Sequence, residues 1–432
     1  MMKKIHKFYF ISLTIVFALL FLLFAALTYK PVINYAIVYI SSSILYVLIC
    51  WFILKYKIPT SYIFSLIALA LILRIALISF HPIGSDDYYR YVWDGKVMAS
   101  GINPYEFAPD NIALAKLHSS ILPALVNYPE MKTIYPPLAQ FLFYLSYKIG
   151  GESFIGVKLL LFLFDIMTIF GIFLIIKKLN LDYKNILIYV LSPLPLFQFF
   201  IDAHVDGFGL PLLIFAIYFY ISNKKNWSYF FIGLSICVKP LGLILLPIIF
   251  FNEKTFRERI KAIVILLTIT ALMYLPFIFS GSPFQALLKF TENWTFNGVI
   301  FDILDSFIRD NQRTRLICAA LLLISYLPVI FSKKDFGVKI YLSLFLLFIF
   351  SPVVHPWYLS WLLILLPFIP RWSGIAFTSL ISLTVFTVIN YQLYGVWKEY
   401  NLVLLFEYVP VLFLFLYELM SGKAVINKIL SK

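Results

Sequence analysis

The chain has 432 residues, of which 62% are hydrophobic and only 13% are charged. Soluble domains carry about 45–50% apolar and about 25% charged residues, so this composition excludes a soluble globular protein and indicates one that lipid surrounds. The formal net charge of +14 does not indicate nucleic-acid binding, because the lysine and arginine residues lie in short loops between apolar runs, as in the cytoplasmic loops of membrane proteins.

Three apolar runs open the chain, at Phe8–Leu27, Ile33–Leu54 and Ser61–Phe80. Uninterrupted apolar runs of about 18 or more residues predict membrane-spanning helices, whereas membrane strands need shorter alternating segments. The first run resembles a signal peptide, but its length and the lack of a clear cleavage site favour a retained helix with its N-terminus inside. The lysines before the first run and between the second and third then place the end of the third span at the outer side.

The segment from His81 to Tyr135 is the least apolar part of the chain and contains six acidic residues. Loops of this length are usually functional, so we expect residues 81–135 to form a first outer loop that carries the chemistry. A short amphipathic helix is predicted at Tyr88–Ser100, and the Gly-Ile-Asn-Pro sequence at 101–104 ends it.

Nine further spans are expected after this loop. They are Phe154–Ile176, Asn185–Phe200, His204–Ile221, Ile260–Ser280, Arg313–Ser332, Phe336–Ser351, Pro356–Ile369, Trp372–Tyr391 and Leu402–Met420. Two other apolar segments are expected to cross only partly. Pro137–Ile149 is short for a span, and Ser228–Phe251 is interrupted by Lys239-Pro240, because proline breaks a helix. This arrangement keeps the lysine clusters after the spans on the inside.

The expected fold is therefore an all-α, polytopic transmembrane bundle of about 12–14 membrane segments, in a single domain over residues 1–432. A second outer loop at 281–312 and a turn at 352–358 are expected to share the outer face with the first loop. The chain ends soon after its last predicted span, so no soluble C-terminal domain is expected. The three cysteines lie inside apolar runs and show no metal-ligand spacing.

Asp86 and Asp87 form a pair of adjacent carboxylates just beyond the third span. At the mouth of a membrane bundle such a pair can supply a general base with its orienting partner, or a cation site. Helix capping by Ser85-Asp86-Asp87 is the structural alternative.

The helix that follows carries three more candidates for substrate binding. Tyr91 and Asp94 share one helix face with Asp87, since the three residues are spaced i, i+4 and i+7. Arg90 is the third candidate, although Arg90 and Asp94 are also spaced to pair simply with each other.

His204, Asp206 and Lys239 are ionisable residues at membrane depth, where such groups are functional candidates. His204 and Asp206 fit a sugar or phosphate contact, a buried hydrogen-bonded pair, or a metal, although two or three ligands are too few to argue for a metal. A desolvated lysine needs an anion. A lipid phosphate would suit Lys239, with snorkelling to the interface as the alternative.

Two aromatic motifs lie near the outer ends of later spans. The sequence from Asn293 to Asn297 (NWTFN) offers amides and a ring face suited to sugar binding. His355-Pro356-Trp357-Tyr358 has the aromatic composition of a membrane interface, but His355 adds an ionisable group beside a rigid turn.

These motifs, in this order, resemble the GT-C superfamily of membrane glycosyltransferases, and more narrowly the bacterial polyprenol-phosphate-mannose-dependent mannosyltransferases. The strongest stretch runs from Gly84 through Asp86-Asp87 to Gly95 and continues at Gly101-Ile102-Asn103-Pro104-Tyr105. The later motifs are Ile134-Tyr135-Pro136-Pro137-Leu138, His204-x-Asp206-Gly207, Lys239-Pro240, Trp294–Asn297 and His355-Pro356-Trp357-Tyr358.

The resemblance implies an inverting transfer of a hexose, with mannose favoured, from a polyprenyl-phosphate sugar to a glycan or glycolipid acceptor. Asp87 would be the base, with Asp86 as the other candidate. Cationic side chains such as Lys239 would balance the leaving phosphate, so neither a metal nor a cofactor is expected. The implied substrate-binding residues are Arg90, Tyr91, Asp94, Tyr135, His204, Asp206, Lys239, Asn297, His355, Trp357 and Tyr358.

The same resemblance implies a multi-pass protein of the bacterial inner membrane, with its active site on the outer face and lipids, not nucleic acid, around it. Two other functions fit parts of the pattern. A transporter of lipid-linked sugars also uses broken helices and ionisable groups at membrane depth, but its halves would repeat, and the acidic loop occurs once. A polysaccharide ligase or polymerase is expected to have its largest outer loop later in the chain.

Overall fold

The computed structural model describes residues 4–26 and 31–421, and over these residues the protein is helical, without a β-strand. Lys3 and Leu27, which belong to the expected first span and its flank, lie outside the described residues, as does the expected C-terminal end after Ser421.

The helices are α1 (Lys4–Ala26), α2 (Pro31–Lys55), α3 (Thr60–Leu77), α4 (Asp87–Ala99), α5 (Pro137–Gly150), α6 (Phe154–Lys178), α7 (Leu187–Val190), α8 (Pro193–Pro195), α9 (Asp206–Ile221), α10 (Lys225–Ile236), α11 (Leu246–Asn252), α12 (Phe256–Tyr274), α13 (Gln285–Asn293), α14 (Val299–Ile308), α15 (Asn311–Phe331), α16 (Phe336–Phe350), α17 (Ser360–Leu363), α18 (Trp372–Leu380), α19 (Val385–Tyr394) and α20 (Asn401–Met420). Shorter 3-10 or π-helical turns are η1 (Ile112–Leu117), η2 (Tyr183–Ile186), η3 (Leu196–Ile201), η4 (Pro240–Leu245), η5 (Pro356–Leu359) and η6 (Ile381–Thr384).

Eight helical segments of the described chain are long and apolar enough to cross a membrane. They are Lys7–Phe24, Pro31–Lys55, Thr60–Leu77, Phe154–Lys178, Tyr183–Ile201, Asn311–Phe331, Trp372–Tyr394 and Asn401–Met420. Three shorter apolar helices, Asp206–Ile221, Pro240–Asn252 and Phe336–Phe350, accompany them. The prediction of an all-α, multi-pass membrane protein is therefore confirmed, with fewer full-length spans than the sequence suggested.

Four expected spans are not among these eight. Two of them, His204–Ile221 and Phe336–Ser351, are helices too short for a full span in the structure, and the other two differ more. Pro356–Ile369 is not a spanning helix: η5 is followed by the single turn of α17, and the remaining residues up to Ile369 are buried without helical structure. Irregular backbone at membrane depth is tolerated where protein surrounds it, so apolar composition alone could not identify this segment. In place of Ile260–Ser280 the structure has α12, which is not among the eight candidates because four charged residues (Arg257, Glu258, Arg259 and Lys261) occupy its first two turns.

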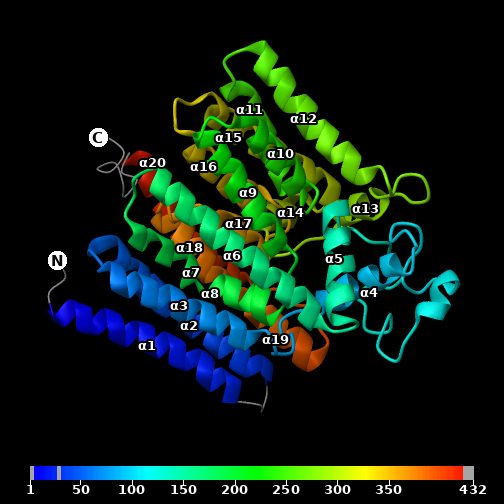
Figure 1. Cartoon of the computed structure of the whole chain (residues 1–432), viewed down its shortest axis with the longest axis horizontal. Coiled ribbons are helices and arrows are strands. Elements are labelled where there is room, and N and C mark those ends of the chain that lie inside the picture. Colours follow the sequence, from blue (N-terminus) through cyan, green and yellow to red (C-terminus); the bar gives the residue numbers. More distant parts are fainter. Residues whose placement is uncertain (1–3, 27–30, 422–432) are drawn as a thin grey trace.

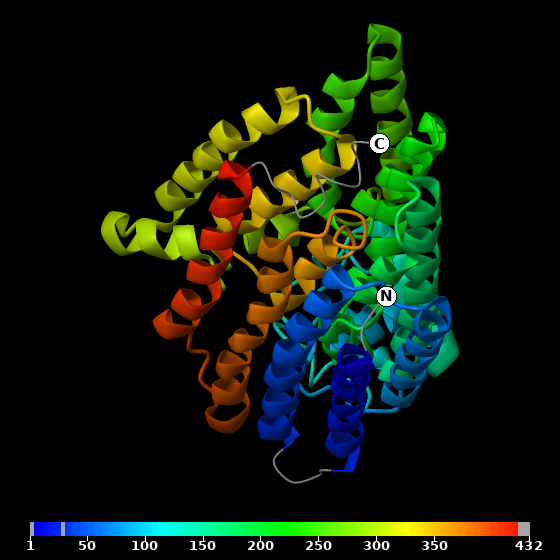
Figure 2. The same cartoon turned by 90° about the vertical axis from the view of Figure 1, so that its left-hand side faces the viewer.

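The long helices α1, α2, α3 and α6 run in nearly the same direction, with α1 packed against α2, and α4, α5 and α13 gather at one end of the bundle (Figure 1). From the second direction, α20 lies beside α18 (Figure 2), in agreement with the extensive contact between these two helices. The residues between α3 and α5, which form the predicted first loop, extend from the same end as α4.

Glycine contacts hold α4 against α5, and α5 against α6. A Cβ atom added to Gly95 of α4 would lie 2.3 Å from the carbonyl oxygen of Phe143 in α5. One added to Gly156 of α6 would lie 2.1 Å from the carbonyl oxygen of Ser146, also in α5. Only glycine permits these close backbone approaches, so the motif glycine Gly95 fixes where α4 lies.

Both local predictions around the loop and the helix break are confirmed. The expected amphipathic helix is α4, and Gly101 follows it with a φ of +77°, a conformation that suits glycine. The break predicted at Lys239-Pro240 separates α10 from η4, and Lys239 itself has an extended backbone. This break leaves the Lys239 side chain free to point toward a cavity rather than along a helix surface.

Candidate active site

A cavity of about 680 Å³ lies where the polar segments meet. Its walls come from residues within 84–91, 127–136, 198–206, 238–240, 287–296, 355–358 and 384–397, together with two tyrosines of α2. The first loop, the second loop and the turn near 355 therefore face one space. Its volume falls in the range of about 300–1,000 Å³ that is usual for small-molecule sites.

Asp87 begins α4 and lines this cavity, and 30% of its side chain is exposed. Its Oδ2 atom lies 3.6 Å from Nδ1 of His204. Burial, followed by the charge of Asp86, raises the pKa of Asp87 to about 6. Asp86 occupies the cap position of α4, but its side chain makes no capping hydrogen bond. Ser85 supplies the side-chain acceptor at the start of α4, from the backbone N–H of Asp87 at 3.2 Å, so capping accounts for the serine but not for the acidic pair.

Lys239 pairs with Asp206 at the cavity wall. The Nζ atom of Lys239 donates to Oδ2 of Asp206 at 2.7 Å and lies 3.6 Å from the ring centre of Tyr358. The other oxygen of Asp206 accepts from Nε1 of Trp361 at 2.9 Å, so this carboxylate is fully buried yet hydrogen bonded at both oxygens. The lysine charge is thus already partly balanced by protein.

Four aromatic rings stack in a column that ends beside Asp87. Phe296, His355, Trp357 and His204 follow one another with ring-centre distances of 4.6, 4.3 and 3.5 Å. Neither ring nitrogen of His204 has a hydrogen-bond partner among the described residues. The column therefore presents a polar ring edge toward the cavity carboxylate while packing fixes the ring plane.

Asp202 is a structural residue that the sequence analysis did not select. Its Oδ1 atom accepts from the backbone N–H groups of Gly84 at 2.7 Å and Ile83 at 3.1 Å, and Tyr35 donates to its Oδ2. A Cβ atom added to Gly84 would collide with this carboxylate at 2.5 Å. Asp202 thus anchors the chain just before Asp86. Its position within the acidic and histidine-containing segment 202–206 was the only sequence signal for it.

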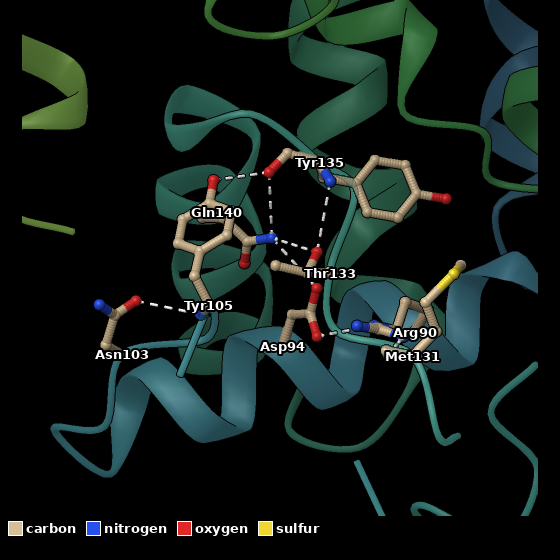
Figure 3. Close-up of polar contacts among 8 residues, drawn as sticks. All are labelled: Arg90, Asp94, Asn103, Tyr105, Met131, Thr133, Tyr135 and Gln140. Carbon is tan, nitrogen blue, oxygen red and sulfur yellow. Dashed lines mark hydrogen bonds and ion pairs between the residues drawn. The ribbon is translucent and has the colours of Figure 1, made fainter. Parts of the chain in front are cut away.

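Arg90 and Asp94 form the ion pair that their i, i+4 spacing allows. This pair belongs to a buried network of hydrogen bonds (Figure 3). Arg90 donates from Nε to Asp94 at 2.9 Å and from Nη1 to the carbonyl of Met131 at 2.9 Å. Gln140 donates to the second oxygen of Asp94 and to Thr133. Asp94 does not line the cavity. Its hydrogen bonds to Arg90 and to Gln140 of α5 instead fix the loop against α5.

Tyr91 and Tyr135 both reach the cavity from this network. Their rings meet edge to face at 5.1 Å, and Tyr91 also stacks on Phe143 of α5 at 4.8 Å. Tyr105 donates from its hydroxyl to the backbone carbonyl of Tyr135 at 2.6 Å. This hydrogen bond fixes the loop backbone beside the cavity (Figure 3).

Asn297 lies apart from the other candidates. Its amide nitrogen is 3.2 Å from both carboxylate oxygens of Glu407, its backbone N–H donates to Glu399 at 2.6 Å, and Tyr408 donates to its carbonyl. Asn297 does not line the cavity. The structure thus gives it contacts that hold the backbone next to Phe296, the first ring of the aromatic column.

Residues 16–252 match the family described as alpha-(1->6)-mannopyranosyltransferase, N-terminal domain. The chain belongs to this family. The matched residues make up more than half of the chain and include Asp87, His204 and Lys239, whereas His355 lies beyond them. Family membership confirms the mannosyltransferase resemblance.

ArnT from Cupriavidus metallidurans, solved bound to undecaprenyl phosphate, is similar to this mannopyranosyltransferase-family chain, with 15% sequence identity and a TM-score of 0.48. The match covers 76% of this chain and 60% of the ArnT chain, so this chain spans less than two thirds of the length of ArnT. No curated protein sequence matches the chain.

Proposed function

We propose that this protein transfers a hexosyl residue, with mannose favoured, from a polyprenyl-phosphate sugar to a glycan or glycolipid acceptor. The transfer inverts the configuration at the anomeric carbon and takes place on the outer face of the bacterial inner membrane. The observation that carries the proposal is the placement of Asp87 at the wall of a cavity built from the polar loops of a membrane bundle, in a chain of a mannopyranosyltransferase family.

Asp87 acts as the general base in this proposal. The acceptor hydroxyl oxygen forms a bond to the anomeric carbon while the bond from that carbon to the phosphate oxygen breaks. The bonding electrons leave with the polyprenyl phosphate, and the hydroxyl proton moves to Asp87. A carboxylate with a pKa of about 6 suits this role, since it is mostly ionised at neutral pH and still a stronger base than an ordinary aspartate. The ring of His204 packs beside this carboxylate, with Nδ1 3.6 Å from Oδ2.

Cationic groups of the cavity wall offset the charge on the leaving phosphate. Lys239 is one, held in place by Asp206. Arg90 is the second: it lines the cavity, and its Nη2 atom has no hydrogen-bond partner within the described residues. Guanidinium and ammonium donors both bind phosphate oxygens well, so no metal or cofactor is needed for this step in the proposal.

Sugar transfer by the purified protein in reconstituted membranes tests the proposal. The protein would receive a panel of polyprenyl-phosphate hexoses with and without a crude lipid acceptor extract. We expect one donor to be consumed, with polyprenyl phosphate and a glycosylated acceptor as products. Movement of intact lipid-linked sugar across the membrane without any donor consumption would instead support the transporter.

The rate of transfer is expected to rise with pH around a midpoint near 6, because Asp87 must lose its proton to act as a base. The charge of Asp86 helps to raise the pKa of Asp87. Asp86→Asn should therefore move the rising limb of the kcat/KM profile to lower pH. Glu130→Gln, on an exposed part of the same loop, is the matched control and should leave the limb in place. If the rising limb of the kcat/KM profile does not move in Asp86→Asn, the limb reports a group other than Asp87.

A further inference from the structure

The mouth of the cavity is lined by two pairs of aromatic side chains from segments far apart in the sequence. Tyr128 of the first loop meets Trp294, which follows α13, edge to face at 4.8 Å. Tyr391 of α19 meets Trp397 at 5.8 Å. All four rings line the cavity, yet Tyr128, Tyr391 and Trp397 remain 50%, 38% and 48% exposed. They are therefore accessible ring surfaces, unlike the buried column below them.

The first pair is held in a fixed geometry. Trp294 stacks on Phe290 of α13 at 5.3 Å, and Arg315 donates from Nη2 to the carbonyl oxygen of Trp294 at 2.6 Å. On the other side, Trp397 packs on Phe296 at 5.3 Å, the first ring of the buried column. Aromatic side chains lose little conformational freedom on binding, so rings fixed in this way form a ready surface for a ligand.

Hydrogen-bonding groups lie directly beside these rings. Asn127 precedes Tyr128 in the chain and lines the same cavity as Asp86 and Asp87. The Trp294–Tyr128 pair thus lies next in the chain to a polar side chain of the cavity that also holds the proposed base. A ligand seated on the rings would lie in the same cavity as Asp87.

We propose that the four rings Tyr128, Trp294, Tyr391 and Trp397 form the subsite for a pyranose unit of the saccharide acceptor. A pyranose presents C–H groups on its faces, which suit the negative face of an aromatic ring, and hydroxyl groups at its edge, which suit Asn127 and Asp86. The donor sugar and its phosphate lie deeper, near Lys239 and Arg90. This assignment rests on the proposed sugar transfer and names the site of its second substrate.

A polyprenyl chain is the competing occupant of these rings, because tryptophan and tyrosine also gather at membrane interfaces. The position of the polar groups favours the saccharide. An isoprenoid chain on the Trp294–Tyr128 pair would press against Asn127 and Asp86 and would leave their hydrogen-bonding capacity unused at a cost in free energy. Tyr128 also belongs to the polar loop 81–135 rather than to a spanning helix.

Trp294→Ala and Trp397→Ala test the subsite in kinetics with two substrates. Each change is expected to raise the KM for an α-1,6-linked mannotriose acceptor about tenfold or more, while the KM for the donor and the slow hydrolysis of donor without acceptor stay within about twofold. Trp227→Ala is the matched control: Trp227 is 55% exposed, packs on two phenylalanines of the bundle and lies away from the cavity. An increase in donor KM with an unchanged acceptor KM would overturn the proposal in favour of the lipid.

A binding measurement separates this proposal from the proposed activity. Mannotriose alone would be titrated into the purified protein while tryptophan fluorescence is recorded. A saturable change that is lost in Trp294→Ala and kept in Trp227→Ala supports the subsite, even in a preparation that consumes no donor. The absence of any saturable change in the wild-type protein would overturn the subsite, and donor consumption in the transfer assay would then still support the proposed function.

Discussion

Asp87→Asn is expected to lower the rate of sugar transfer by at least about 10²-fold, the scale of a lost general base. The amide keeps the size and polarity of the carboxylate but cannot accept the acceptor proton. Folding should survive the change. Burial raises the pKa of Asp87 above its unfolded value, so the ionised form costs stability at neutral pH, and its neutral replacement removes that cost.

Transfer by proteoliposomes and thermal unfolding in detergent are the two measurements for this variant. Glu130→Gln is the matched control, since it changes an exposed carboxylate of the same loop that does not line the cavity, and it is expected to keep most of the activity. A folded Asp87→Asn protein with nearly full activity would show that another group takes the proton. A large loss in Asp86→Asn alone would exchange the roles of the two residues.

Lys239→Met is expected to lower the free energy of unfolding by about 3–5 kcal/mol and to abolish transfer, because it leaves the fully buried Asp206 without its cation. Adding Asp206→Asn removes the uncompensated charge and keeps an acceptor for Trp361. The double variant should therefore regain most of the lost stability. Transfer should stay low, since the phosphate would still lack the lysine.

The buried pair of Arg74 and Asp165 supplies the control for this experiment. Its members join α3 and α6 at 2.7 Å and do not line the cavity. Arg74→Met should lower thermal stability to a similar degree, while the transfer rate for each folded molecule stays near that of the wild type. Normal transfer by the stabilised Lys239→Met/Asp206→Asn protein would show that Lys239 has only a structural role.

Much of the fold could be predicted from the sequence because its signals are local. Long apolar runs identify spanning helices by composition alone, and all eight candidate spans overlap runs that the sequence marked. The short helix before Gly101 and the break at Lys239-Pro240 follow from backbone restrictions on glycine and proline, which act within a few residues. The segment Pro356–Ile369 was mispredicted, because an apolar run buried inside protein has the same composition as one in lipid.

The candidate site also has features that the sequence shows and features that only the tertiary structure shows. The residue types of the acidic loop, of His204 and Asp206, of Lys239 and of the His355 turn are visible in the sequence, and their chemistry could be listed before any coordinates, although their roles stay predictions. Several of the decisive contacts join residues more than a hundred positions apart in the chain. Only the tertiary structure could show that Asp202 holds Gly84, or that Asn297 turns to Glu407 and away from the cavity. Apolar composition and backbone restrictions act along the chain, whereas the direction of a side chain is decided by what packs against it.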